Sequence, residues 1–162
     1  MLIKAFKELL VLNPGRNIQL HIAGDGETMP QVKSLIEELE LADSVKLHGM
    51  LNTSALVSFM TSLDIYVHAT LGETLSNSIM QAMACGLPII ASDVWGVNNM
   101  ITNGETGLLY EPGNTGDLAK KINSVIHDAQ LRNRLATTAR TYAEQHYDNK
   151  VMFRRYRELF LS

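Results

Sequence analysis

The sequence predicts an α/β domain with a doubly wound parallel sheet of the Rossmann-like type. Short apolar segments alternate along the chain with longer segments of helical periodicity. Such alternation is typical of right-handed βαβ units, whose consecutive strands lie parallel with helices on both faces of the sheet. The 162 residues fit one domain, and 46% apolar with 19% charged residues is the composition of a soluble globular protein.

The first elements follow from hydrophobic spacing and turn residues. Apolar residues at helical spacing over 2–12 predict a helix that Asn13-Pro14-Gly15 stops. Apolar and polar residues then alternate over 18–22, which predicts a strand. Thr28 can cap the next helix, whose first turn tolerates Pro30.

The middle of the chain repeats this order. A short strand is expected over 45–48 and a helix over 56–63, capped by Asn52 or Thr53. A further strand is expected over 64–69. Parallel sheets bind ligands beyond the carboxyl ends of their strands, so the loops that follow these strands are expected to carry function.

The second half predicts two more strands and several helices. A polar loop leads to a helix over 76–84, which Gly86 ends before an apolar strand over 89–91. A short helix is expected to follow Trp95-Gly96 and to end near Thr102. The remaining expected elements are a strand over 108–110, an amphipathic helix over 118–126, and a helical segment from 131 to the end that breaks near Tyr147-Asp148.

Composition excludes several classes of function. The net charge of -3 gives no basic face, so a nucleic acid is not expected as partner. Cys85 is the only cysteine, which excludes an intrachain disulfide and fits a reducing compartment. No apolar run approaches the roughly 20 residues that span a bilayer. The protein is therefore expected in the cytoplasm, with contact at the inner face of the membrane left open.

The common cofactor motifs are absent. The sequence contains no P-loop, and Gly24-Asp25-Gly26 lacks the third glycine of a dinucleotide fingerprint because Met29 stands in its place. No Cys/His cluster has metal-ligand spacing, and no Gly-x-Ser-x-Gly elbow occurs. Neither a bound cofactor nor a metal is expected.

One strand-loop-helix segment, residues 68–88, carries the clearest chemistry. The stretch Thr74-Leu75-Ser76-Asn77-Ser78 opens its helix, where free backbone N–H groups and the helix dipole attract an anion such as a phosphate. Glu73 lies just ahead, and a carboxylate beside a phosphate site makes sense if it accepts hydrogen bonds from sugar hydroxyls. Gln81 lies about two helical turns inside the helix and can face the same cleft.

A purely structural interpretation of this segment stays open on local chemistry alone. Ser76 can act only as a helix cap, Glu73 only as a favourable charge at the helix dipole, and Gln81 only as a surface residue. His21 and His68 lie on expected strands and are interpreted as structural residues. Trp95 can either stack on a ligand or pack against the protein.

The segment resembles the signature of the family 4, or group 1, retaining glycosyltransferases. That signature is Glu-x7-Glu followed by Ala-Met-Ala-x-Gly-x-Pro and an apolar strand. The resemblance rests on Glu73, on 82–92 and on Gly96, and on three further motifs in the expected order, which are Ile22-Ala23-Gly24-Asp25-Gly26, Val45-Lys46-Leu47-His48-Gly49 and Asn103-Gly104-Glu105-Thr106-Gly107-Leu108-Leu109. The likeness covers nearly the whole chain.

The resemblance implies roles for particular residues. Glu73 is expected to be the catalytic-site residue that holds hydroxyls of the donor sugar. The remaining implied contacts are with the donor nucleotide: amides around Leu75, Ser76 and Asn77 to the diphosphate, the loop of Gly49, Met50 and Leu51 near the nucleobase, and Gln81 to the ribose. Gly24 is expected among the donor-binding residues. The family usually has Glu at position 81, and Gln81 keeps an acceptor oxygen but loses a charge-assisted bond.

The resemblance also implies parts that this chain lacks. It resembles the C-terminal, nucleotide-sugar-binding half of a GT-B enzyme over 1–162, with 147–162 as a terminal crossover helix. In the family, an acceptor-binding N-terminal domain and a strand with a Gly-Arg-x(n)-Lys-Gly loop come before the first helix. That strand would lie centrally, in the order 3-2-1-4-5-6, so two strand edges are expected to be unpaired and to rearrange or to self-associate.

The sequence therefore predicts the donor-binding part of a glycosyltransferase. The full enzyme is expected to transfer a sugar from a nucleotide diphosphate sugar to an acceptor hydroxyl with retention, in polysaccharide or glycolipid synthesis. The isolated chain is expected to be inactive, because positive charge on the departing diphosphate would come from the absent loop. The alternatives are a non-catalytic nucleotide or nucleotide-sugar binding module and a structural remnant without a ligand.

Overall fold

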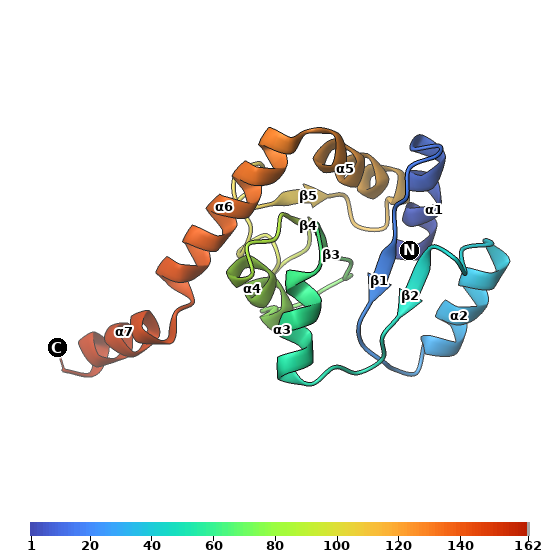
Figure 1. Ribbon diagram of the computed structural model, residues 1–162. Coiled ribbons are helices and arrows are strands. Elements are labelled where there is room, and N and C mark those ends of the chain that lie inside the picture. Colours follow the sequence, from blue (N-terminus) through green and yellow to red (C-terminus); the bar gives the residue numbers. More distant parts are fainter. Residues whose placement is uncertain (162) are drawn as a thin grey trace.

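The structure is a computed structural model that describes residues 1–161, with the backbone alone at Met152 and Arg155. Helices and strands alternate along most of the chain, as the hydrophobic spacing predicts (Figure 1). The elements are α1 Leu2–Leu12, β1 Leu20–Ile22, α2 Met29–Glu38, β2 Val45–Leu47, α3 Thr53–Thr61, β3 Tyr66–His68, α4 Asn77–Ala84, β4 Ile89–Ser92, β5 Leu108–Tyr110, α5 Thr115–His127, α6 Ala129–His146 and α7 Asn149–Leu161.

The parallel sheet is divided into two pieces. β1 pairs with β2, and β3, β4 and β5 form a separate three-stranded piece in that order, all parallel. β1 and β3 each have one edge without a strand, and the two pieces stand apart (Figure 1). The expected gap at the place of a central strand is confirmed, and the edges of β1 and β3 do not pair with each other.

The pairing pattern shows which backbone groups face this gap. The Leu20 amide donates to Ser44 O and Ile22 O accepts from the His48 amide, so these residues of β1 bond towards β2. Successive residues of a parallel strand bond to opposite sides, which directs the His21 backbone towards the gap. By the same alternation, Tyr66 bonds towards β4 and the Val67 backbone faces the gap from the other side.

Two apolar clusters hold the pieces together. The first packs the buried face of α1, including Phe6 and Leu9, against α5 and reaches strands of both sheet pieces through Val45 and Ile90. The second lies around α4, α6 and β4, whose four residues are all buried. A strand covered on both faces reads as a continuous apolar run, which explains the sequence over 89–91.

One expected helix cap is present, another makes no capping hydrogen bond, and one expected short helix does not form. Asn52 caps α3 by accepting a hydrogen bond from the Ala55 amide at 3.0 Å. Thr28 precedes α2 as expected, but its side chain makes no capping hydrogen bond. The expected short helix after Trp95-Gly96 is wrong: residues 95–100 form successive turns, because their hydrogen bonds mix three- and four-residue spacing.

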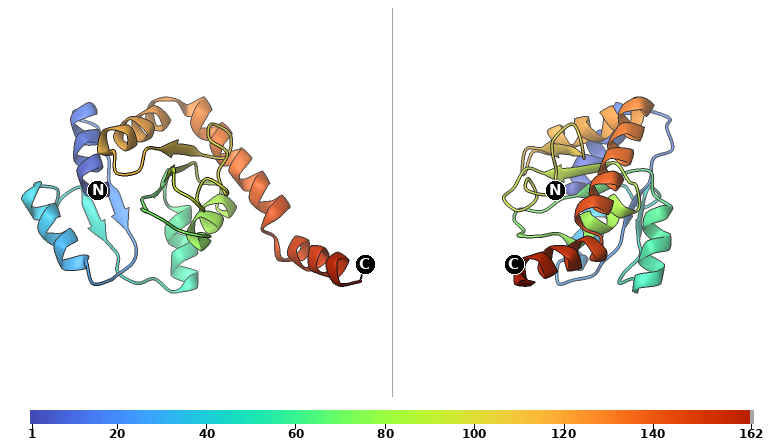
Figure 2. Two further views of the ribbon diagram at one scale, coloured as in Figure 1. Left: turned by 180° about the vertical axis from the view of Figure 1, so that it is seen from behind. Right: turned by 90° about the vertical axis from the view of Figure 1, so that its left-hand side faces the viewer.

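The last helix projects from the body of the domain. α6 ends at His146, with Tyr147 as its C-cap, and α7 begins at Asn149, so the expected break is confirmed, and α7 points away from the rest (Figure 2). Its side chains Phe153, Tyr156 and Phe160 are exposed. Within residues 1–161, no helix is both long and apolar enough to cross a bilayer.

Candidate functional site

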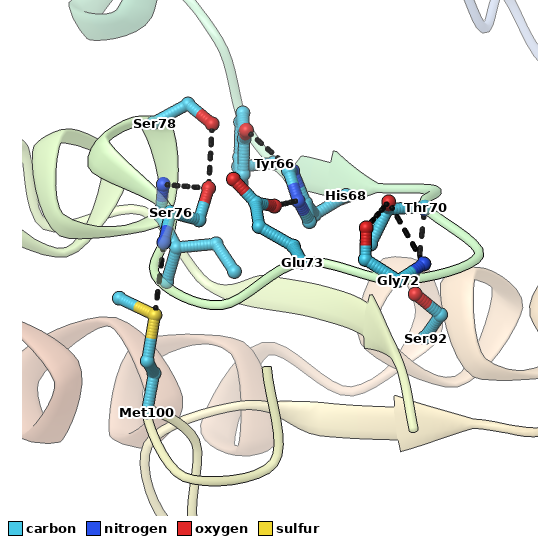
Figure 3. A network of polar contacts seen from close by, with 10 residues as sticks. Tyr66, His68, Thr70, Gly72, Glu73, Ser76, Ser78, Ser92 and Met100 are labelled. Carbon is cyan, nitrogen blue, oxygen red and sulfur yellow. Dashed lines mark hydrogen bonds and ion pairs between the residues drawn. The ribbon is translucent and has the colours of Figure 1, made fainter. Parts of the chain in front are cut away.

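The loop between β3 and α4 carries a compact polar network (Figure 3). Glu73 Oε2 lies 2.6 Å from His68 Nε2 at the end of β3. His68 Nδ1 in turn lies 3.1 Å from the hydroxyl of Tyr66. The Glu73 side chain is about 30% exposed, so this carboxylate is held by the protein and still open to a ligand.

The start of α4 lies directly beyond Glu73. Ser76 is fully buried, and its Oγ caps the helix by accepting from the Ile79 amide at 3.4 Å and contacts Ser78 Oγ at 2.9 Å. The Ser76 amide donates to Met100 Sδ at 3.3 Å, a weak acceptor. Ser76 thus has the capping role that the structural interpretation expects. This role is compatible with a ligand at the same helix start.

Two amides at this helix start remain available for an anion. The amides of Leu75 and Asn77 donate to no acceptor within the part of the chain that the structure describes. The first turn of α4 contains no acidic residue, so nothing there neutralises the positive end of the helix dipole. The helix start can therefore accept negative charge, as the sequence predicts.

Gly96 fixes the position of the Glu73 loop. It has φ +92°, and a Cβ on it would lie 1.7 Å from the carbonyl oxygen of Glu73 and 3.0 Å from Thr74 Cα. Only glycine permits this contact, because the colliding atoms belong to the backbone and cannot turn away. Gly96 thus packs directly against the backbone of the Glu73 loop. Its place in the sequence motif did not reveal this role.

Gly24 and the loop expected near the nucleobase, Gly49, Met50 and Leu51, lie at the carboxyl ends of β1 and β2. The Gly24 amide donates to Gly49 O at 2.7 Å, which joins the two loops, and Gly49 has φ +63°. Met50 is 76% exposed and Leu51 is half-buried. These four residues lie together, on the sheet piece that does not carry Glu73.

A cavity of about 780 Å³ occupies the space between the two sheet pieces. Its wall includes Ser78 and Gln81 of α4, Tyr66 of β3 and His21 of β1. Gln81 thus faces the cavity from the helix that Glu73 precedes, while Tyr66 joins the cavity to Glu73 through His68. The structure therefore brings Glu73, Leu75, Ser76 and Asn77 together and places Gln81 on the adjoining cavity.

Sequence reasoning missed the part that His68 plays. His68 was interpreted as structural, but its ring contacts Glu73 directly. A signal was available: alternation along β3 places Tyr66 and His68 on the same face, towards the side chains that follow the strand. Burial raises the pKa of the Tyr66 phenol, a hydrogen bond with Ser78 partly offsets this, and the Glu73 carboxylate raises it further. Tyr66 therefore stays a proton donor in this network.

A histidine pair on the cavity side predicts pH-dependent stability. His21 Nδ1 lies 2.9 Å from His48 Nε2, and His21 Nε2 lies 3.3 Å from Gln19 Oε1. Burial lowers the pKa of His21 from 6.5, and His48 and Lys46 lower it further. In the unfolded chain His21 has its ordinary pKa of 6.5, and in the folded protein its pKa is lower. Between these two values the folded protein binds fewer protons than the unfolded chain. The contribution of His21 to folding stability is therefore complete above pH 6.5 and is lost as the pH drops below it.

This dependence is measured as the melting temperature at pH 7.5 and pH 5.5. We expect wild type to melt at a lower temperature at pH 5.5, and His21→Gln to lose less over the same interval because its side chain cannot be protonated. His127→Gln is a comparison at a histidine bonded to Asn13 rather than to another histidine. An equal fall in wild type and His21→Gln would show that the pair does not control this loss.

Residues 1–142 match the family model described as "Glycosyl transferases group 1". The chain belongs to the group 1 glycosyltransferases. The family match confirms the resemblance drawn from the motifs at Glu73 and 82–92.

Curated relatives of this group 1 glycosyltransferase chain are longer proteins. An alpha-D-kanosaminyltransferase of Streptomyces kanamyceticus is 33% identical over 125 residues, which are 77% of this chain and 32% of that protein. An N,N'-diacetylbacillosaminyl-diphospho-undecaprenol alpha-1,3-N-acetylgalactosaminyltransferase of Campylobacter jejuni is 34% identical over 122 residues, 75% of this chain and 32% of that protein. The chain thus spans about a third of the length of these curated relatives.

Solved structures agree with the fold. Anabaena Alr3699/HepE in complex with UDP-glucose aligns with a TM-score of 0.87 and 27% identity, over 98% of this chain and 43% of that one. The C-terminal domain of the glycosyltransferase LpcC from Francisella tularensis aligns with a TM-score of 0.80 and 23% identity, over 91% of this chain and 77% of that one. The predicted Rossmann-like, C-terminal half of a GT-B fold is confirmed.

Proposed function

We propose that this group 1 glycosyltransferase chain binds the nucleotide diphosphate sugar for an enzyme that transfers the sugar to an acceptor hydroxyl with retention, in polysaccharide or glycolipid synthesis. The proposal rests on the position of Glu73 directly ahead of the start of α4. A part-exposed carboxylate stands directly ahead of a helix start whose Leu75 and Asn77 amides have no acceptor in residues 1–161. This is the chemistry of a sugar diphosphate, hydroxyls at one end and negative charge at the other.

Each part of the donor would then meet a matching part of the protein. Glu73 would accept hydrogen bonds from sugar hydroxyls, and the amides of Leu75 and Asn77, with Ser76 as helix cap, would hold the diphosphate. Gln81 would meet the ribose at the cavity wall. The loops of Gly24 and of Gly49, Met50 and Leu51 would meet the base. Support comes from the place of these loops at the carboxyl ends of parallel strands.

The test is a calorimetric titration of this chain with UDP-, GDP- and ADP-sugars and with the bare nucleotides. We expect one base series to bind, with the sugar adding affinity over the nucleotide diphosphate alone. The proposal includes no bound metal, so binding should persist in EDTA. Absence of binding by every series at millimolar ligand would contradict a donor site in this chain.

A non-catalytic binding module remains the second candidate, for the isolated chain. A departing diphosphate needs positive charge, and Lys7 of α1 instead donates to Leu39 O, the C-cap of α2, at 2.9 Å. We therefore expect the isolated chain to bind the donor without hydrolysing it. Donor hydrolysis by this chain alone, above the rate in buffer, would show that it carries the complete catalytic set.

The free strand edges predict association with a further strand. The His21 and Val67 backbones face a gap that apolar side chains line on both sides, among them Phe6, Phe59 and Ile122. We propose that a strand from the N-terminal part of a full-length enzyme, or from a second copy, covers this gap. In the isolated chain we expect sedimentation velocity to show association that grows with protein concentration. A compact monomer at every concentration, with slowly exchanging His21 and Val67 amides, would contradict exposed edges.

A further inference from the structure

We propose that His68 is the positioning residue for Glu73, and that Tyr66 fixes the tautomer in which His68 does this. The inference rests on the proposed function, because it concerns the carboxylate assigned to the donor sugar. It adds two residues that the glycosyltransferase motifs do not include. His68 and Tyr66 act through Glu73 and need not touch the donor.

The two contacts of the His68 ring favour one tautomer of the neutral imidazole. Glu73 Oε2 is an acceptor at 2.6 Å, so His68 Nε2 must carry the hydrogen and donate it. A neutral ring then has an unprotonated Nδ1, which accepts from the Tyr66 hydroxyl at 3.1 Å. The raised pKa of Tyr66, mainly from its burial, keeps that hydroxyl protonated. All hydrogen bonds thus run in one direction, from Tyr66 through His68 to Glu73.

The strand makes this arrangement rigid. Tyr66 and His68 belong to β3, where they pair with Ile89 and Ala91 of the buried strand β4. His68 is only 16% exposed in its side chain, and the rings of Tyr66 and His68 stack with centroids 6.1 Å apart. A loop carboxylate is therefore tied to a strand that pairs with the fully buried strand β4 (Figure 3).

The two carboxylate oxygens of Glu73 therefore have different roles. Oε2 is occupied by His68, and Oε1 has no hydrogen-bond partner within the described residues. One oxygen fixes the rotamer, and the other is left to accept from a hydroxyl. A carboxylate held before the ligand arrives loses less conformational entropy on binding, so the pair should raise affinity for the sugar and not for the nucleotide.

The first test reads the tautomer in the free protein. Long-range ¹H–¹⁵N NMR of the histidine side chains distinguishes a protonated Nε2 from a protonated Nδ1. We expect the Nε2–H tautomer for His68 in wild type. In Tyr66→Phe the Nδ1 partner is lost, so the Nε2–H tautomer should be less dominant, although the Glu73 acceptor still favours it. An Nδ1–H tautomer in wild type would overturn the proposal, whether or not any donor binds.

The second test measures binding of UDP-, GDP- and ADP-glucose, each against its sugar-free diphosphate. In His68→Phe we expect the sugar nucleotide that binds wild type to weaken roughly three- to tenfold, with its diphosphate unchanged. His68→Gln should recover part of this loss, because its amide N–H can reach Glu73 as Nε2 does. Equal weakening of sugar nucleotide and diphosphate in His68→Phe would show a general structural role and overturn the proposal.

A double-variant cycle separates this inference from the proposed function. If His68 acts only through Glu73, adding His68→Phe to Glu73→Ala should cause no further loss of binding. A further loss in the double variant would overturn the positioning role and leave the donor site standing. No effect of Glu73→Ala itself would instead overturn the proposed function of Glu73.

Discussion

Glu73→Ala is expected to weaken binding of the nucleotide sugar by about 10- to 100-fold and to leave the bare nucleotide diphosphate nearly unaffected. Hydrogen bonds that involve a charged group contribute roughly 1.5–3 kcal/mol, and about 1.4 kcal/mol corresponds to a tenfold change in Kd. Glu73 lies ahead of the α4 helix start and is held at 2.6 Å by His68, so its contribution should fall on the sugar. Calorimetric titration of both ligands with wild type and variant measures the difference.

The control removes a carboxylate elsewhere. Glu38 is exposed on α2, and Glu38→Ala makes the same change in net charge away from the site. We expect it to change neither affinity. Similar weakening by Glu38→Ala and Glu73→Ala would mean that net charge, and not a local contact, governs binding. Weakening of sugar nucleotide and diphosphate to the same extent in Glu73→Ala would place Glu73 outside the sugar contact.

Gly96→Ala is expected to abolish measurable donor binding and to destabilise the fold by on the order of 2–4 kcal/mol. The new Cβ would lie 1.7 Å from the carbonyl oxygen of Glu73, and Gly96 itself is held next to the buried Val97. The Glu73 loop must therefore move, which takes the carboxylate away from His68. Urea unfolding gives the stability change, and titration under native conditions gives the loss of binding.

Gly113→Ala is the matched control for this substitution. Gly113 also has a positive φ, +80°, but a Cβ on it would meet no atom within 4 Å. It therefore carries the cost of a left-handed alanine, about 1–2 kcal/mol, without the collision. We expect Gly113→Ala to lose that stability and keep donor binding. If the two variants lost the same stability and both bound the donor, the contact between Gly96 and Glu73 would not position the loop.

The local elements were predictable because they depend on near neighbours in the chain. Helical spacing over 2–12 and 118–126, the caps Asn52 and Ser76, and the break at Tyr147-Asp148 all appear as expected. The expected helix after Trp95-Gly96 failed, since the packing of Gly96 against the Glu73 loop holds that segment in turns. Packing against a distant segment overrode a local helical pattern.

The order of the elements also determined the fold class, and the family resemblance implied the gap in the sheet. Alternating strands and helices require parallel strands, and the motif at Glu73 and Gly86 lies in the loop and helix that follow one of them. The unpaired edges of β1 and β3 followed from the expected strand order.

Only the tertiary structure decided how the site is held. The bond between His68 and Glu73 and the donor Tyr66 behind it form within one short segment, and the contact of Gly96 joins that segment to the next loop of the chain. A sequence pattern shows which residue types are present, and periodicity shows which face each one takes. The distance between a strand side chain and a loop carboxylate depends on how the loop packs, and that packing is set by contacts that are remote in the chain.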